Sequence, residues 1–215
     1  MGHAMYNTKV IRPSADIDSI AALIKNNPNA ITLQFVPGTK FDMVTLLTPS
    51  VILIESGSIA LYRKYDDKLI LDFNPPFPFG ITESSSTADN YYLIANTESR
   101  VTLLDKRSYY ATLKDSDILM SMLRIVNYLI DVAEERQRIN VQLTNSYDII
   151  KHCLGEIWAT EECKRETLSI YDYIMSRHRM SRSSITKIIK SLNDGGYIVS
   201  ERGILKNLKN LPVRY

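Results

Sequence analysis

The sequence predicts an α+β protein in which a β-rich N-terminal part, one long amphipathic helix and a C-terminal helix-turn-helix with a β-hairpin follow one another. Three observations predict this order. Short apolar runs separated by turn residues fill residues 10–112, and an apolar heptad pattern fills residues 113–145. Helix-period patterns followed by a glycine-marked hairpin fill residues 146–215. We therefore expect three parts with these boundaries.

The β-rich part begins with a helix expected over residues 16–26, capped by Ser14 or Asp16. Short apolar runs bounded by Pro, Gly, Asp and Ser then predict a sandwich or barrel. Three prolines between residues 75 and 78 exclude a central strand there, because proline cannot donate to a sheet ladder. The expected strands are 31–36, 51–54, 59–65, 69–73, 91–95 and 101–104.

The long helix is expected over residues 115–143 and carries two apolar stripes. Two stripes indicate two partners: one stripe can pack on the β-rich part, and the other can pair with the same helix of a second chain. We expect a homodimer, the alternative being a helix buried within one chain. Asn127 could set the register of the pair as a buried polar residue does. The stripe with heptad spacing, assigned to the dimer interface, is Ile118, Met122, Ile125, Leu129, Val132 and Ile139. The adjacent stripe is Leu119, Leu123, Val126, Ile130 and Ala133.

The C-terminal part predicts helices over residues 146–160 and 168–177, separated by a polar loop at 161–166. A further helix is expected to begin after Ser181, a natural N-cap, and to end at Gly195-Gly196. Two helices joined by a short turn form a helix-turn-helix. Residues 198–200 and 204–206 then predict a β-hairpin, a wing, with Gly203 in its turn. The last helix has a buried face of Ile185, Ile188, Ile189 and Leu192, and an opposite face of Arg182, Ser183, Thr186, Lys187 and Lys190.

Positive charge is concentrated at the C-terminal end. Residues 177–215 contain nine Lys or Arg and two Asp or Glu, whereas the whole chain carries a net charge of only +2. A basic end on a mildly acidic body indicates a polyanionic partner. The alternative is a solvated basic face.

The order of these parts resembles the CRP/FNR family of bacterial transcription regulators over nearly the whole chain. The strongest motif runs from Met180-Ser181-Arg182 to Ile198. Residues 55–61 are similar to the family's β-roll signature, and Phe79-Gly80 to its "FG" turn. The chain is also similar to the CRP-like group called inhibitors of hydrogen peroxide resistance. The resemblance implies a jelly-roll, cyclic-nucleotide-binding-like N-terminal domain, a dimerisation helix and a winged helix-turn-helix.

The same resemblance implies a stress-linked regulator that binds a pseudo-palindromic operator in double-stranded DNA as a homodimer, with RNA polymerase as a further partner. Arg182 and Lys187 match positions that contact base edges, where an arginine can bond guanine bidentately. Ser183 replaces the glutamate common in the family, so we expect a different operator. Phosphate contacts are expected from Ser184, Thr186 and Lys190. The complete expected DNA-binding set is Arg179, Ser181, Arg182, Ser183, Ser184, Thr186, Lys187, Lys190, Arg202 and Lys206.

The β-rich part lacks what a cyclic nucleotide needs. No Lys or Arg occurs between Lys68 and Arg100, so a cyclic phosphate would have no cation to pair with. We therefore expect no cyclic-nucleotide site, and no cofactor or metal. Two cysteines cannot hold an iron–sulfur cluster that needs four. Cys153 is expected to be inert core, while Cys163 is a candidate oxidant sensor because Lys164 and Arg165 flank it.

Other function classes are disfavoured. Metal cupins need clustered histidines on the strands, and residues 4–110 contain none. No nucleophile elbow, phosphate loop or paired-carboxylate motif occurs either, so we expect no enzyme. The sequence also predicts no membrane span and, from its cysteine usage, a cytoplasmic location. The remaining alternative is a protein–protein interaction module on a winged-helix scaffold that has lost DNA binding.

Overall fold

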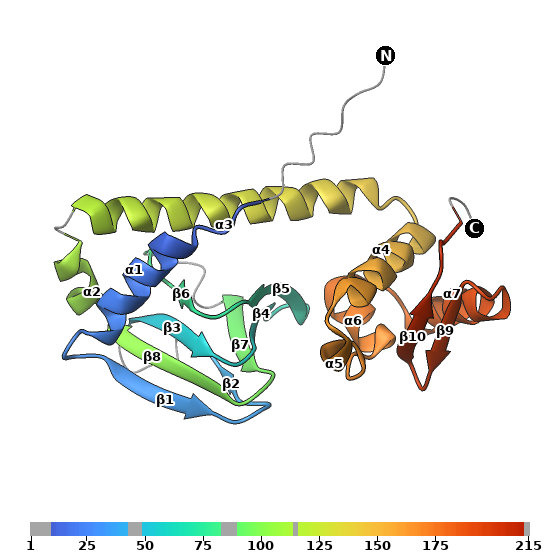
Figure 1. Cartoon of the computed structure of the whole chain (residues 1–215), viewed down its shortest axis with the longest axis horizontal. Helices are drawn as coiled ribbons and strands as arrows, with labels where there is room; N and C mark the ends of the chain where they lie inside the picture. The colour runs from blue at the N-terminus through green and yellow to red at the C-terminus, as the bar shows by residue number, and fades with distance from the viewer. Residues whose placement is uncertain (1–9, 43–48, 83–89, 114–115, 213–215) are drawn as a thin grey trace, which may run out of the picture. The chain divides into compact units, whose positions relative to one another are not determined.

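The computed structural model describes residues 10–42, 49–82, 90–113 and 116–212. The chain divides into two compact units, residues 1–136 and 137–215 (Figure 1). The sequence predicted three parts, and the boundaries of those three parts remain a prediction. Each unit is described by itself below.

The N-terminal unit contains two four-stranded antiparallel sheets. One sheet has the order β1-β8-β3-β6 and the other β2-β7-β4-β5. The expected strands are present, and the sheets also contain the short strands β2 and β6. Strand β6 lies at a sheet edge, as its single proline, Pro78, requires. The bounds are β1 Ile31–Phe35, β2 Lys40–Phe41, β3 Ser50–Ser56, β4 Ile59–Arg63, β5 Lys68–Phe73, β6 Phe77–Phe79, β7 Tyr91–Ala95 and β8 Ser99–Asp105.

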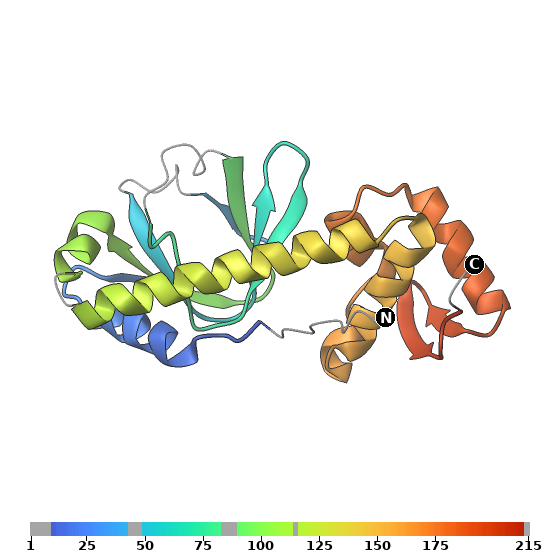
Figure 2. The same cartoon turned by 90° about the horizontal axis from the view of Figure 1, so that it is seen from above.

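Three helices complete this unit: α1 Ser14–Lys25, α2 Lys106–Thr112 and the first part of α3 Ser116–Gln142 (Figure 2). The expected cap of α1 is wrong. Its N-cap is Pro13, which has no side-chain hydrogen bond to offer. The Asp16 carboxylate instead accepts hydrogen bonds from Arg124 and Ser121 of α3, both at 2.9 Å. The hydrogen bond from Arg124 is the main reason why the pKa of Asp16 lies below its ordinary value. Asp16 therefore joins α1 to α3.

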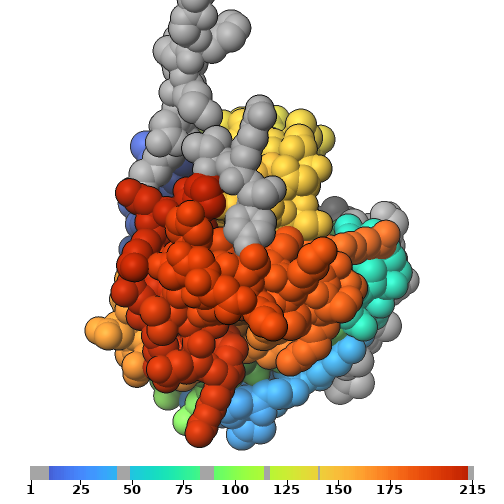
Figure 3. All heavy atoms as spheres, turned by 90° about the vertical axis from the view of Figure 1, so that its right-hand side faces the viewer, coloured from blue at the N-terminus to red at the C-terminus, as the bar shows by residue number. Residues whose placement is uncertain are grey.

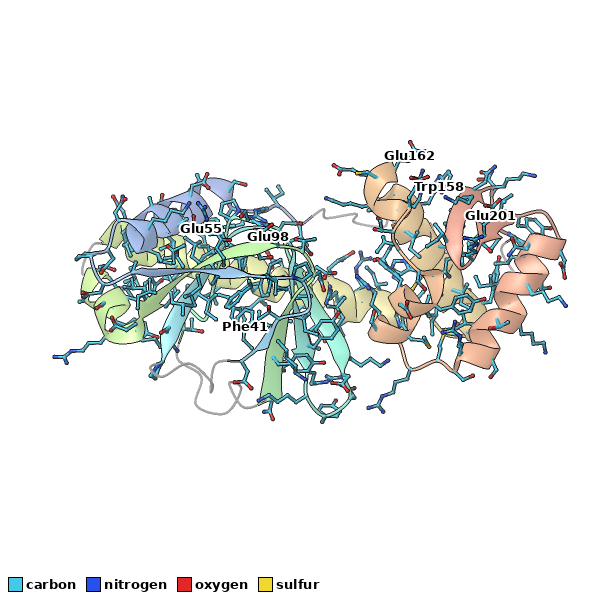
Figure 4. All side chains as sticks on the ribbon, turned by 90° about the horizontal axis from the view of Figure 1, so that it is seen from below. Phe41, Glu55, Glu98, Trp158, Glu162 and Glu201 are labelled. Atoms are coloured by element: carbon cyan, nitrogen blue, oxygen red, sulfur yellow. The ribbon has the colours of Figure 1, made fainter. Side chains whose placement is uncertain are left out.

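The core of the N-terminal unit lies between the sheets and the helices. β3 is buried almost throughout, and α1 contributes Ile17, Ile20 and Ile24 at helical spacing. Phe41 and Glu55, on β2 and β3, mark the two sheets in Figure 4. The Glu55 carboxylate pairs with Lys25 of α1 at 2.9 Å, so it lies on the side of the sheet that α1 covers.

The packing of α3 removes one residue, Ile125, from the predicted dimer interface. Ile125 is completely buried within its own chain, and Ile118, Met122 and Leu129 pack against the same core. Ile125 is therefore not available to a second subunit, whereas Ile118, Met122 and Leu129 are half-buried and their place in a dimer interface stays a prediction. Val132 and Ile139 are half-buried. Of the adjacent stripe, Leu119, Leu123 and Ile130 are 40%, 45% and 51% exposed.

Besides the end of α3, the C-terminal unit contains four helices and a two-stranded antiparallel sheet in its described residues. The helices are α4 Ser146–Ala159, α5 Glu162–Arg165, α6 Ile170–Arg177 and α7 Arg182–Asp194, and the strands are β9 Ile198–Glu201 and β10 Ile204–Leu208. The polar segment expected as a loop contains the short helix α5. Near it, the guanidinium of Arg165 lies 4.2 Å from the ring centroid of Trp158, which is labelled in Figure 4, and donates to the carbonyls of Trp158 and Thr160. Arg165 thus holds α5 to the end of α4.

A second apolar core holds the C-terminal unit together. Ile150, Cys153, Leu154 and Ile157 of α4 supply one wall, and a second wall comes from α6, α7 and the wing. The second wall is Ile170, Ile174, Ile185, Ile189, Leu192, Ile198 and Leu205. Helices α4, α6 and α7 each bury residues three or four apart, so the remaining face of each is left to solvent.

Candidate nucleic-acid interface

The helix-turn-helix consists of α6, a short turn and α7. Ser169 caps α6 by accepting a hydrogen bond from the backbone N–H of Asp172 at 3.3 Å. Ser181 caps α7 in the same way, accepting from the N–H of Ser184 at 3.2 Å. These serines satisfy N–H groups that a helix leaves unpaired in its first turn. The predicted cap at Ser181 is confirmed.

The two faces of α7 differ as predicted. Ile185, Ile189 and Leu192 are buried, and Ile188 is half-buried. The opposite face carries cations and hydroxyls and contains no acidic residue before Asp194. Because the first turn also lacks an acid, nothing offsets the positive end of the helix dipole there. This face therefore presents positive charge and hydrogen-bond donors to solvent.

The two lysines of α7 are available to a ligand. Lys187 and Lys190 are both exposed, and neither has an ion-pair or hydrogen-bond partner in the part of the chain that the structure describes. Arg182, at the first helical position, is also exposed, but its guanidinium lies 4.8 Å from the ring of Tyr171 on α6. This geometry is a cation–π contact.

The hydroxyl groups at the start of α7 form a small cluster. The Ser181 hydroxyl lies 3.0 Å from that of Ser183 and 2.8 Å from that of Ser184. The Thr186 hydroxyl donates to the backbone carbonyl of Arg182 at 2.8 Å. A phosphate contact by Thr186 would therefore exchange a bond within the helix for one to the ligand.

The wing follows α7 through a short turn. Its strands are joined by Arg202 and Gly203, both with positive φ (50° and 82°), which is the backbone of a tight hairpin. The Asn193 amide on α7 donates to the Ser200 hydroxyl and accepts from the Ser200 backbone N–H, both at 2.9 Å. This pair ties the wing to α7. Sequence reasoning missed Asn193, because its partner is set by the fold rather than by spacing along the helix.

The structure brings the predicted DNA-binding residues onto exposed positions of one small unit. Lys206, on the wing, lies 3.4 Å from the carboxylate of Glu166, an exposed ion pair that a ligand can replace at small cost. Figure 3 shows this unit with its orange-to-red residues facing the viewer. The exposed residues are Arg179, Ser181, Arg182, Ser183, Ser184, Thr186, Lys187, Lys190, Arg202 and Lys206.

A group of titratable residues on α4 and α6 lies outside the predicted DNA-binding set. His152 pairs with Glu156 at 3.4 Å, and the Tyr173 hydroxyl donates to the same carboxylate at 3.2 Å. The hydrogen bond to Glu156 raises the pKa of His152. Burial would raise the pKa of Glu156, but its bonds to His152 and Tyr173 and the nearby charge of Arg177 together lower it. These groups stabilise the helix pair.

The two cysteines lie in opposite environments. Cys153 is completely buried in the core, and burial raises the pKa of its thiol to about 12. The expectation that it lies in the core is therefore confirmed, and its inertness remains a prediction. Cys163 on α5 is exposed, and its predicted role as an oxidant sensor remains a prediction.

Metal-ligand clusters and membrane-spanning helices are both lacking from the described ranges. No three His, Cys, Asp or Glu residues there are grouped so that they could hold an ion. No described helix combines the length and apolarity that crossing a bilayer requires. Most of the serine-rich loop judged for cyclic-nucleotide binding, residues 83–89, lies outside the described residues.

Comparison with known families identifies the C-terminal unit. Residues 146–213 match the family model described as winged helix-turn-helix DNA binding. This range covers α4 through the wing, so the helix-turn-helix and hairpin predicted from the sequence are confirmed.

Curated relatives carry a common name. The "Inhibitor of hydrogen peroxide resistance" of Salmonella typhimurium is 25% identical over 189 residues, covering 83% of this chain and 90% of the relative. The Escherichia coli K12 protein of the same name is 34% identical over 71 residues, a third of either chain.

Solved structures share the fold over most of the chain. One is a protein of Eubacterium rectale described as a transcriptional regulator of the CRP/FNR family, with a TM-score of 0.66, 16% identity and coverage of 93% of this chain and 94% of that one. Another is the c-di-GMP-responsive global regulator CLP of Xanthomonas campestris, with a TM-score of 0.66, 15% identity and coverage of 89% and 100%. The chain therefore has the fold of CRP/FNR regulators and contains a winged helix-turn-helix DNA-binding domain.

Proposed function

We propose that this protein is a transcription regulator that binds double-stranded DNA sequence-specifically as a homodimer. The observation that carries the proposal is the solvent face of α7, where cations and hydroxyls are exposed and no acid interrupts them before Asp194. Such a face suits the major groove, which admits one helix and is lined by phosphates. The match of residues 146–213 to a DNA-binding family supports it.

Within this proposal, the residues divide into those that read bases and those that contact the DNA backbone. Arg182 at the first position reads guanine, and Lys187 contacts a second base edge. Ser183 cannot accept from cytosine as a glutamate would, so the operator differs from that of regulators with glutamate there. Ser184, Thr186 and Lys190 contact phosphates, and Arg179, Arg202 and Lys206 contact the backbone from the turn and the wing.

The proposed dimer uses the exposed face of α3. Met120, Leu123, Asn127 and Ile130 are exposed and follow a 3-4-3 spacing, which is a heptad seam. Leaving three large apolar side chains in water along one helix face is unfavourable, and pairing with a second copy buries them. Asn127 at the centre of the seam would favour one register, as polar residues at such positions do.

Leu123→Glu tests the dimer. A buried unpaired charge at the seam should convert the protein to a monomer in sedimentation equilibrium. Val36→Glu is the matched control, because it places the same charge on an exposed apolar residue (68% exposed) in the turn after β1 and should leave a dimer. A Leu123→Glu protein that stays dimeric at the concentrations where the wild type does would contradict the seam.

We also propose that the regulated genes belong to a response to oxidants and that RNA polymerase is a further partner. The support for the link to oxidants is the name of the Salmonella relative, which is similar to this chain along most of its length. Reporter output with and without peroxide, in cells with wild-type protein and with none, tests it. Equal output under all four conditions would contradict the link.

Arg182→Ala tests the DNA proposal itself. The affinity of purified protein is measured at fixed salt for a duplex selected from a random library and for a shuffled duplex of equal composition. We expect the variant to lose most of the preference for the selected duplex while keeping its affinity for the shuffled one, because phosphate contacts are untouched. If the wild type binds neither duplex in a salt-dependent way, a protein–protein interaction module is the better account.

A further inference from the structure

We propose that Tyr171 is a positioning residue that holds the side chain of Arg182 and the tip of the wing at a fixed spacing for DNA reading. Tyr171 is the second residue of α6 and was not among the residues that the sequence singled out. The proposal rests on the proposed function, because it concerns how the base-reading arginine is oriented.

One contact of the Tyr171 ring is with the arginine. The Arg182 guanidinium lies 4.8 Å from the ring centroid, whereas the lysines of α7 have no partner in the described part of the chain. A free arginine side chain samples many rotamers, and ordering it on binding costs affinity. A guanidinium already held against an aromatic ring has lost part of that freedom before DNA arrives, because the contact favours one orientation.

The ring also lies close to the wing turn. Gly203 forms the wing turn at a φ of 82°, and a Cβ added there would lie 3.3 Å from the Tyr171 ring. The backbone is bonded at the same place, because the N–H of Ile170 donates to the Gly203 carbonyl at 2.8 Å. Ser169 and Ile204 add an isolated β-bridge. The start of α6 and the wing turn therefore form one connected piece.

The ring thus lies between the two parts of the surface that must meet DNA together. Arg182 is proposed to reach a base edge, and Arg202, next to Gly203 in the turn, is proposed to contact the backbone. Because the same ring lies beside both Arg182 and the wing turn, replacing it should weaken the recognition of the base by Arg182. It should remove no phosphate contact. This separates Tyr171 from a residue that merely fills the core, whose loss would weaken all binding by unfolding the unit.

The test measures specificity, salt dependence and folding together on the full-length protein. Binding to the selected duplex and to its shuffled counterpart is titrated at several salt concentrations for the wild type, Tyr171→Leu, Tyr171→Phe and Tyr171→Leu combined with Arg182→Ala. Tyr173→Leu is the matched control. Tyr173 lies on the same helix and makes a cation–π contact with Arg177 at 3.6 Å rather than with Arg182. Thermal unfolding of each variant reports on stability.

We expect Tyr171→Leu to lower the preference for the selected duplex while shuffled-duplex affinity and the salt slope stay unchanged. The free energy of an exposed cation–π contact corresponds to a loss of preference of about two- to fivefold per subunit. For two subunits the expected loss of preference is about five- to thirtyfold. Tyr171→Phe keeps the ring and should stay within about twofold of the wild type on the same scale. In the Arg182→Ala background, Tyr171→Leu should have no further effect on the preference.

Three results would overturn the proposal. The first is an unchanged preference for the selected duplex in Tyr171→Leu. The second is an equal loss of preference in Tyr173→Leu. The third is a full loss of preference in Tyr171→Phe, which would assign the effect to the hydroxyl. Failure of the proposed function looks different, because the wild type itself would then show no preference between the two duplexes.

Discussion

Lys190→Gln removes one exposed cation from the solvent face of α7. Lys190 has no partner among the described residues, so the substitution breaks no ion pair within the protein. Glutamine keeps a polar side chain and a good helix propensity, so α7 should form as before. Any change in DNA binding then reports on the lost charge.

The magnitude follows from counterion release. Each phosphate that a protein neutralises on duplex DNA contributes about 0.9 to the slope of log affinity against log salt. A homodimer carries two copies of Lys190, so the slope should become shallower by about 1.8, whereas a monomer would lose about 0.9. The size of the change therefore tests the phosphate contact and the number of subunits together.

The assay is fluorescence anisotropy on a labelled duplex at salt concentrations of about 50 to 300 mM, the range over which such slopes are commonly resolved. Lys164→Gln is the matched control, because Lys164 on α5 is an exposed lysine of the same unit that lies outside the proposed surface. Its slope should equal that of the wild type. An unchanged slope in Lys190→Gln, or an equal change in the control, would refute the placement of α7 against phosphates.

Three further predictions concern stability and reactivity. Gly57→Ala should destabilise the N-terminal unit by at least about 2 kcal/mol in denaturant unfolding. Gly57 has a φ of 88°, and a Cβ added there would collide with the backbone oxygen of Glu98. A loss under about 0.5 kcal/mol would contradict this. Iodoacetamide at mildly alkaline pH should label Cys163 and spare Cys153 in the folded protein, so mass spectrometry should show a single adduct; rapid double labelling would argue against the buried thiol. His152→Gln should cost more stability at pH 5.5 than at pH 8.5, by about 0.5 kcal/mol as for a partly exposed ion pair. The raised pKa of His152 makes its bond to Glu156 stabilising below the ordinary histidine pKa, and that contribution is lost as pH rises through the folded value; equal costs at both pH values would exclude it.

The parts of the fold that local patterns determine were predictable. The buried stripe of α7, its cap at Ser181 and the wing turn at Gly203 each depend on residues close in sequence, and the structure has all three. The cap of α1 was not predictable in the same way. Asp16 is of a residue type that caps helices well, but its carboxylate accepts a hydrogen bond from Arg124, more than 100 residues away.

The assignment of the α3 stripes shows the same limit. Ile118 to Leu129 and the adjacent stripe are both apolar, and nothing in their spacing decides which one meets the β-rich unit. Burial of Ile125 in its own core decides it, and this depends on how α3 lies over the sheets. The contact of Tyr171 with Arg182 and Gly203 is equally invisible in sequence, because it joins α6, α7 and the wing.

Selection of bound fragments from a random DNA library with the purified full-length protein tests the central claim most directly. A two-fold dimer with one α7 in each half-site predicts an enriched motif of two inverted half-sites, with centres about 10 base pairs or a multiple of one helical turn apart. A single asymmetric motif would contradict the dimer. A library that emerges without any enriched sequence would contradict sequence-specific DNA binding.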